Sequence, residues 1–276
     1  MTHELLEVAV GLGALEGPLW TRHGSLVVTS LSRGVLYEVG DDGPRLFAET
    51  GGGPNGLAEG PDGSIWVAQN GGTPRASSSQ RKVTPGIQRV RNGLVEDLIT
   101  SGLDAPNDCI FAPDGRLWFT DPRGGGSSAG PTPGRVCALD TNTLDLEVLV
   151  DGPLYPNGLA FGSDPDDFYL AETSTGRVLN ARRTSDGISG FEVFAQLPEG
   201  APDGMVLDRS GNLLVAASRA NAVFVFDSGG TLIDRIDVGQ DEPVMVSNLC
   251  LGGPDGDTLF ITVFKGGRVF SCHWPQ

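Results

Sequence analysis

A motif of the form Pro-Asn-Gly-Leu-Ala recurs along the whole chain, and we call it the head motif. Its fullest copy is at 155–161, and more divergent copies lie at 16–20, 54–58, 106–112, 202–207 and 247–251. Copies spaced by roughly 40 to 50 residues are typical of a β-propeller or a related repeat array, in which every repeat forms one supersecondary unit. This repetition constrains the fold more than any other feature of the sequence.

Each head motif is followed by a turn and a second apolar stretch. The turns at 61–63 and 113–115 are Pro-Asp-Gly, and Asp-Gly between apolar runs favours a β-hairpin. A third and a fourth strand are predicted after each hairpin, except that the last repeat has no fourth strand of its own, which residues 5–10 can supply. We therefore predict an all-β, six-bladed β-propeller over residues 1–276, a single domain whose ring is closed by the N-terminal strand in the last blade.

The chain is acidic, with a formal net charge of −16 and a pI of about 4.4. This charge argues against nucleic acid or an anionic membrane as a partner, since both require a basic face. No apolar run approaches the length of a membrane span, and the first residues lack the basic region of a signal peptide. We expect a cytoplasmic protein, a monomer or weak homo-oligomer, with a small-molecule substrate.

Equivalent positions of the head motifs should converge on one circle, because the inner strands of a propeller run along its axis. These positions hold only oxygen donors: Glu16, Asn55, Asn107, Asn157, Asp203 and Asn248. Hard oxygen ligands favour Ca²⁺, Mg²⁺ or Mn²⁺ over softer metals, and two carboxylates balance one divalent cation. The competing interpretation is that these residues are only repeated turns, but turns do not require carboxylates at Glu16 and Asp203.

The sequence resembles the senescence marker protein, gluconolactonase and luciferin-regenerating enzyme family at four places. These are 16–20, 106–122, 156–160 and 202–204. The resemblance implies a six-bladed propeller that hydrolyses lactones with a central divalent metal held by Glu16, Asn107, Asn157 and Asp203. Ca²⁺ is the first expectation for this metal, and Zn²⁺, Mg²⁺ and Mn²⁺ are alternatives.

Asp203 is the predicted general base of this reaction. A metal on the circle would polarise the lactone carbonyl and stabilise the developing oxyanion, while Asp203 takes a proton from the attacking water. Direct nucleophilic attack by Asp203 is the alternative. Hydrolysis of phosphotriesters or other esters at the same metal, and a non-catalytic metal-binding propeller, are the alternative functions.

Five further side chains are predicted to contact the substrate: Asn55, Asp121, Arg123, Glu172 and Phe264. Ala105 stands where the sugar-lactonase pattern has an arginine, which counts against a polyhydroxylated lactone such as gluconolactone. Two segments rich in glycine and serine, 70–82 and 123–133, separate the second and third strands of their repeats. Loops of this length are often functional, and we expect them to cover one end of the ring.

Overall fold

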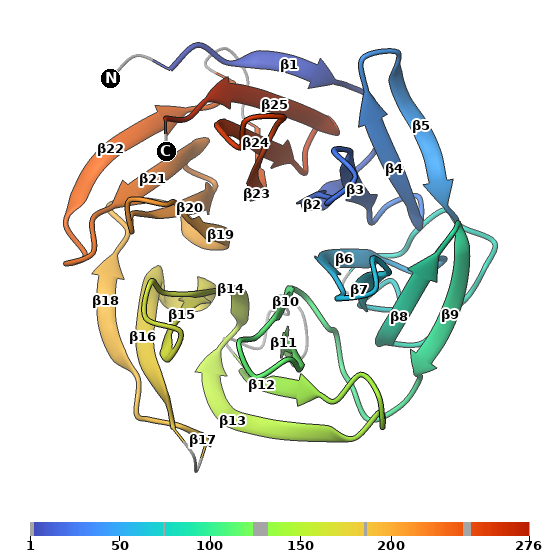
Figure 1. The fold of residues 1–276 in the computed structure, drawn as a ribbon, viewed down its shortest axis with the longest axis horizontal. Helices are drawn as coiled ribbons and strands as arrows, with labels where there is room; N and C mark the ends of the chain where they lie inside the picture. The colour runs from blue at the N-terminus through green and yellow to red at the C-terminus, as the bar shows by residue number, and fades with distance from the viewer. Residues whose placement is uncertain (1–2, 74, 124–131, 185–186, 240–243, 276) are drawn as a thin grey trace.

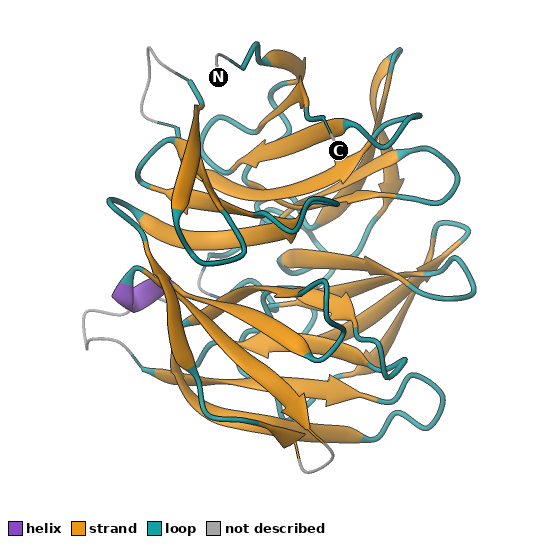
Figure 2. Cartoon of the chain, turned by 60° about the vertical axis from the view of Figure 1, so that its left-hand side comes forward, coloured by secondary structure: helices purple, strands orange, loops and turns teal. Residues whose placement is uncertain are grey.

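Six β-sheets surround a central axis in the computed structural model, which describes residues 3–73, 75–123, 132–184, 187–239 and 244–275 (Figure 1). Within these ranges the chain is almost entirely strand and loop, and its one helical element is a single 3₁₀ turn at Thr173–Thr175 (Figure 2). The predicted six-bladed propeller is confirmed. No helix in the described ranges has the length and apolar character needed to cross a membrane.

The blades follow one another around the ring in sequence order, and each runs from an inner to an outer strand (Figure 1). The inner strands are β2 (Leu15–Trp20), β6 (Pro54–Glu59), β10 (Cys109–Phe111), β14 (Pro156–Phe161), β19 (Ala201–Leu207) and β23 (Val246–Gly252). The second strands are β3 (Leu26–Ser30), β7 (Ile65–Gln69), β11 (Leu117–Asp121), β15 (Asp167–Glu172), β20 (Leu213–Ser218) and β24 (Thr258–Val263). The head motifs thus supply the inner strands or lead into them.

The third and outer strands complete each blade. The third strands are β4 (Val35–Gly40), β8 (Gly86–Arg91), β12 (Pro133–Leu139), β16 (Arg177–Thr184), β21 (Ala222–Phe226) and β25 (Arg268–His273). The outer strands are β5 (Gly43–Ala48), β9 (Leu94–Ile99), β13 (Leu146–Leu154), β18 (Glu192–Gln196), β22 (Leu232–Asp237) and β1 (Leu6–Ala9). Because neighbouring strands are antiparallel, the loops between second and third strands all lie at one end of the ring.

The N-terminal strand closes the ring, as predicted. β1 pairs antiparallel with β25, with Leu6 opposite Ser271 and Glu7 opposite Phe270. This pairing covers the edge of β25 that would otherwise be exposed, and it joins the two ends of the chain in one blade.

Blade 4 departs from the predicted pattern at its outer edge. We expected one fourth strand at 190–194, whereas β16 pairs with the two-residue strand β17 (Gly187–Ile188) and also with β18. The reason is the length of β16, whose last residues extend beyond β18 and pair with β17 instead. The outer strand itself begins two residues later than expected.

The hydrophobic core is divided among the interfaces between neighbouring blades. In the described residues each of six clusters joins two adjacent sheets. Successive side chains of a second strand enter different clusters: Trp118 packs between blades 3 and 4, and Phe119 packs between blades 2 and 3. Because side chains alternate across a strand and both faces are covered, the second strands are buried along almost their whole length.

Glycines in the head motifs allow the inner strands to approach one another closely. A Cβ atom on Gly56 would overlap Asp108 of the next blade, and one on Gly158 would overlap the backbone of Asp203. The Gly56 N–H also donates a hydrogen bond to the Asn107 carbonyl oxygen at 2.7 Å. Glycine is therefore needed at these positions for the inner strands to lie close together around the axis. The head motif thus serves the packing of the blades as well as any ligand binding.

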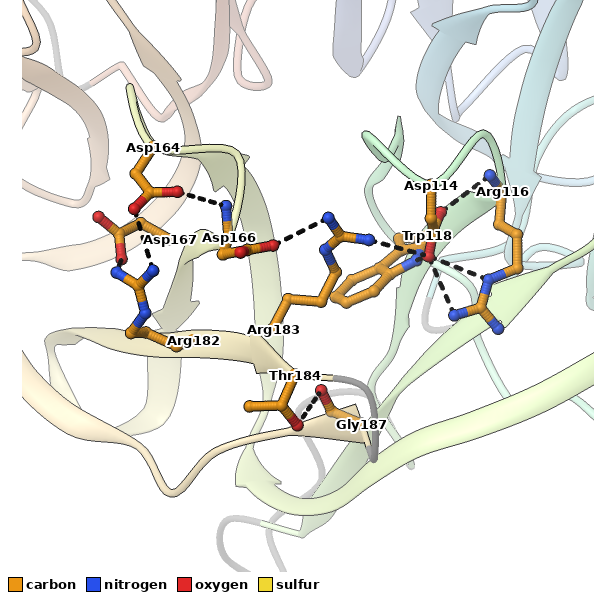
Figure 3. Close-up of polar contacts among 10 residues, drawn as sticks. All are labelled: Asp114, Arg116, Trp118, Asp164, Asp166, Asp167, Arg182, Arg183, Thr184 and Gly187. Carbon is orange, nitrogen blue, oxygen red and sulfur yellow. Dashed lines mark hydrogen bonds and ion pairs between the residues drawn. The ribbon is translucent and has the colours of Figure 1, made fainter.

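Polar contacts connect blades 3 and 4 at the end formed by the turns between inner and second strands (Figure 3). Arg183 bonds to Asp166 of its own blade at 2.9 Å and lies 3.9 Å from Asp114 of blade 3. Asp114 also accepts a hydrogen bond from the Trp118 indole at 3.3 Å. These contacts are partly exposed and lie at the end of the ring opposite the second-to-third-strand loops, so we assign them to the blade junction.

Candidate functional site

A cavity of about 520 Å³ lies at the end of the ring formed by the loops between second and third strands. Its lining includes all four predicted metal ligands, together with two of the predicted substrate contacts: Glu16, Asn107, Asn157, Asp203, Asn55 and Phe264. These residues come from six different blades, one from each. The propeller therefore brings together side chains that are far apart in the sequence.

Glu16 and Asp203 are two carboxylates in this cavity with mutual electrostatic repulsion. Burial, followed by the charge of Asp108, raises the pKa of Asp203 to about 8. Burial, followed by the charges of Asp203 and Asp108, raises the pKa of Glu16 well above its usual value. In the described part of the chain, neither Glu16 nor Asp203 forms an ion pair with an arginine or a lysine. Two acidic groups held together without a cationic partner favour either protons or a bound cation.

Asp108 is a third acidic residue at this site, and sequence reasoning did not select it. Burial raises the pKa of Asp108 to about 6. Its carboxylate accepts hydrogen bonds from the Asn248 amide at 3.2 Å and from the Cys109 N–H at 3.2 Å. A signal was present in the sequence, because the residue after the asparagine is glycine in the copies at 54–58 and 156–160 but aspartate here.

The Asn157 side chain is held by a contact of its amide nitrogen. The nitrogen donates to the Thr173 hydroxyl at 3.1 Å, and that hydroxyl donates to the Pro202 carbonyl oxygen at 2.7 Å. Since this contact uses the nitrogen, the side-chain oxygen stays available as a ligand.

Asn55 has a buried side-chain oxygen that finds no hydrogen-bond partner among the described residues. The residue is 6% exposed and lines the cavity, and this oxygen is its Oδ1 atom. Leaving a buried acceptor unsatisfied costs roughly 1–3 kcal/mol, so such an atom is usually paired by a ligand, an ion or a water.

The donor set fits a hard divalent cation. Among the described residues no three His, Cys, Asp or Glu side chains gather as a metal cluster. The predicted set instead combines two carboxylates with two asparagine amides, all of them oxygen donors. Oxygen ligands, uncompensated negative charge and the unpaired Asn55 oxygen together suit Ca²⁺, Mg²⁺ or Mn²⁺. The role of these four residues as ligands stays a prediction.

Asp121 and Glu172 lie outside the lining of the cavity and hold the backbone that leads to the proposed ligands. Asp121 accepts hydrogen bonds from the Ala105 N–H at 2.7 Å and from Arg135 at 2.7 Å. Glu172 accepts hydrogen bonds from the Leu154 N–H at 2.9 Å and from Arg177 at 2.8 Å. Each acidic residue ends a second strand, and each fixes a segment shortly before a head-motif asparagine.

The other predicted substrate contact, Arg123, also lies outside this lining. It forms ion pairs with Asp151 at 2.8 Å and with Asp104 at 3.7 Å. Most of the neighbouring segment 123–133 lies outside the described residues, although Thr132 lines the cavity. The other long segment, 70–82, contributes Asn70, Thr73 and Arg75 to the lining, in agreement with its expected position.

Replacing Asp121 by alanine should strongly destabilise the fold, although the change removes only one small side chain. Asp121 is fully buried, and Asp121→Ala would leave two backbone N–H groups without their acceptor and would take from Arg135 its buried carboxylate partner, at a cost of about 3–5 kcal/mol. Urea unfolding would measure this loss. Asp104→Ala is the matched control, because Asp104 binds the same arginine from a half-exposed position and should cost about 1 kcal/mol or less. Equal effects of the two changes would contradict the role assigned to Asp121.

Comparison with known proteins identifies relatives along the whole chain. Residues 15–265 match the family described as SMP-30/Gluconolactonase/LRE-like region. A gluconolactonase from Zymomonas mobilis is 28% identical over 280 residues, covering 90% of this chain and 75% of that protein. A pentonolactonase from Haloferax volcanii is 32% identical over 171 residues, covering 59% of this chain and 56% of that protein.

A solved structure agrees with the fold. The gluconolactonase from Xanthomonas campestris superimposes with a TM-score of 0.82 at 26% identity, covering 99% of this chain and 90% of that one. The likeness extends over the complete ring, including the blade that holds both ends of the chain.

Proposed function

Because the chain belongs to the SMP-30/gluconolactonase/LRE-like family, we propose that it is a lactonase that opens a cyclic ester with the help of one divalent cation. The two lactonases among its relatives support hydrolysis of a lactone as the reaction class. The cation, its ligands and the role of each residue are the parts of the proposal that go beyond this likeness.

We assign the cation to the four oxygen-donor residues of the cavity: Glu16, Asn107, Asn157 and Asp203. Bound there, a divalent cation supplies Lewis acidity, which polarises an ester carbonyl. Glu16 and Asp203 contribute the negative charge, and the two asparagines contribute neutral oxygens at positions fixed by the head motifs. The Asn55 oxygen is free to accept a hydrogen bond from a substrate hydroxyl or from a water at the site.

Asp203 carries out the proton transfer in this proposal. Its carboxylate accepts a proton from the attacking water while the water oxygen bonds to the lactone carbonyl carbon. The ring C–O bond then breaks, the released alkoxide takes up the proton, and the product is a hydroxy acid. Asn157 lowers the pKa of Asp203, which favours the ionised carboxylate that accepts the proton.

The observation that carries the proposal is the pair of carboxylates, Glu16 and Asp203, which share one cavity and form no ion pair with an arginine or a lysine of the described ranges. In a propeller that binds no cation, two buried carboxylates close together would only reduce the stability of the fold. At a catalytic cation site they are required, because they provide both affinity for the metal and a proton acceptor next to the reacting carbonyl.

A lactone panel with and without chelator tests this proposal. Purified protein is depleted of metal and assayed by proton release on neutral lactones and on an activated phosphotriester, before and after addition of Ca²⁺, Mg²⁺, Mn²⁺ or Zn²⁺. We expect lactone hydrolysis that chelation abolishes and one of these cations restores. Hydrolysis that survives chelation would refute the metal mechanism. Turnover of the phosphotriester alone would favour the ester hydrolase alternative, and cation binding without turnover would favour a non-catalytic propeller.

A further inference from the structure

Two arginines lie at the mouth of the cavity, and we call Arg75 and Arg219 the rim arginines. Both belong to the lining of the same cavity as the carboxylates. Arg75 comes from the segment between β7 and β8 of blade 2, and Arg219 from the turn between β20 and β21 of blade 5. The cavity therefore has acidic groups along the axis and positive charge at its exposed end.

Arg75 is held in place from two sides. Its guanidinium lies over the ring of Phe264 in blade 6, 5.3 Å from the ring centre. Its segment is tied to blade 1 by the Ser78 N–H and hydroxyl, which donate to the Ser32 carbonyl oxygen at 2.8 and 3.1 Å. A guanidinium that packs its face on an aromatic ring keeps the N–H groups at its edge available for an anion.

Arg219 occupies a constrained position in a tight turn. Its φ angle is 72°, in the left-handed region that residues other than glycine rarely adopt. The turn is closed by a hydrogen bond from the Ala220 N–H to the Ala217 carbonyl oxygen at 3.1 Å. This conformation fixes the backbone of Arg219 in the turn beside the cavity.

Most arginines that the structure describes form an ion pair with a carboxylate, and the rim arginines do not. Arg45, for example, pairs with Glu38 at 2.8 Å, and Arg235 pairs with Asp237 at 2.6 Å. Within the described ranges, neither Arg75 nor Arg219 forms an ion pair with a carboxylate. In a chain with 35 acidic and 19 basic residues, two uncompensated guanidinium groups at one cavity are a specific arrangement.

We propose that the rim arginines bind an anionic substituent of the substrate, so that the preferred lactone carries a carboxylate or a phosphate away from its reacting ring. This inference rests on the proposed lactonase function and specifies its substrate class. The rim arginines also offset the repulsion that an acidic protein exerts on an anionic substrate. Ala105 replaces the arginine of the sugar-lactonase pattern. This replacement agrees with recognition of the substrate from a different side of the cavity.

The test compares lactones that differ only in charge. Gluconolactone is paired with the glucarolactone of the same ring size, in which a carboxylate replaces the terminal hydroxymethyl group, and phosphogluconolactone forms a second pair with its unphosphorylated form. We expect wild type to show a higher kcat/KM for the anionic member of at least one pair. The pair that shows it identifies the carboxylate or the phosphate as the recognised group.

Arg75→Gln and Arg219→Gln should each lower the anionic-to-neutral ratio of kcat/KM about tenfold, as expected for loss of one charge-assisted hydrogen bond. Arg45→Gln is the matched control, since it removes the same charge from an exposed outer strand far from the cavity, and it should leave the ratio unchanged. A ratio that stays the same in both rim variants, with normal hydrolysis of neutral lactones, would overturn this inference and leave the proposed function intact.

Binding gives a second readout that does not depend on turnover. If the wild-type protein hydrolyses no lactone, the proposed function fails. Calorimetry with sorbitol phosphate and with sorbitol then tests whether the rim arginines bind an anion. Binding of the phosphate that both rim variants weaken would support an anion site. If sorbitol phosphate and sorbitol bind with the same affinity, or if the rim variants bind the phosphate as well as the wild type does, the anion site is refuted.

Discussion

Asp203→Asn should lower kcat by about a thousandfold or more while the protein still folds and keeps part of its affinity for the cation. Removing a general base costs about 10² to 10⁴ in rate, and Asp203 is also one of the two charged ligands in our proposal. Asparagine preserves the shape and one oxygen donor but cannot accept the proton. Steady-state assays by proton release, with calorimetric titration of the cation, measure both effects.

The matched control for this change is Asp166→Asn, which removes a carboxylate at the opposite end of the ring, where Asp166 bonds to Arg183 (Figure 3). Its turnover should equal that of the wild type. Normal turnover in Asp203→Asn would remove Asp203 from the reaction. A single turnover in oxygen-labelled water separates the two possible roles, because label enters the Asp203 carboxylate only if it attacks the substrate directly.

The stability of the metal-free protein should fall as the pH rises from about 4 to about 8. Asp203 has a pKa of about 8 in the folded chain against a reference value of 3.8, so the folded state binds its proton more tightly than the unfolded state. The resulting stabilisation is complete below the unfolded pKa and is lost as the pH rises through the folded pKa. The raised pKa of Glu16 acts in the same direction.

A divalent cation should reverse this loss. It binds the ionised carboxylates of the folded chain, so the difference in melting temperature between cation-loaded and chelated protein should grow with pH across the same window. Thermal unfolding at several pH values, with saturating Ca²⁺ and with chelator, measures this difference. Asp203→Asn should flatten the pH dependence of the chelated protein. A difference that is constant between pH 4 and 8 would contradict the site.

The architecture was predictable because one motif marks every inner strand. Six copies of the head motif fixed the number of blades, and the missing fourth strand of the last repeat indicated closure by the N-terminus. The outer edge of blade 4 was not predictable in the same way, because the pairing of β16 with both β17 and β18 depends on the length of β16. No repeated residue marks that length.

The composition of the cavity was partly predictable. Residues at the start of inner strands, such as Glu16 and Asp203, converge because every blade presents the same position to the axis. Asp121 and Glu172 were expected in the pocket, but residues at the end of a second strand turn toward the segment that precedes the inner strand. The rim arginines depend on contacts between loops of different blades, and the repeat contains no information about those contacts.

In our proposal Glu16, Asn107, Asn157 and Asp203 together hold one divalent cation. Crystals of the protein loaded with Mn²⁺, measured for anomalous scattering, test it most directly. We expect one strong anomalous peak in the cavity within bonding distance of an oxygen atom of each of these four side chains. The absence of a peak there at saturating Mn²⁺, or a peak bound by other residues, would contradict it.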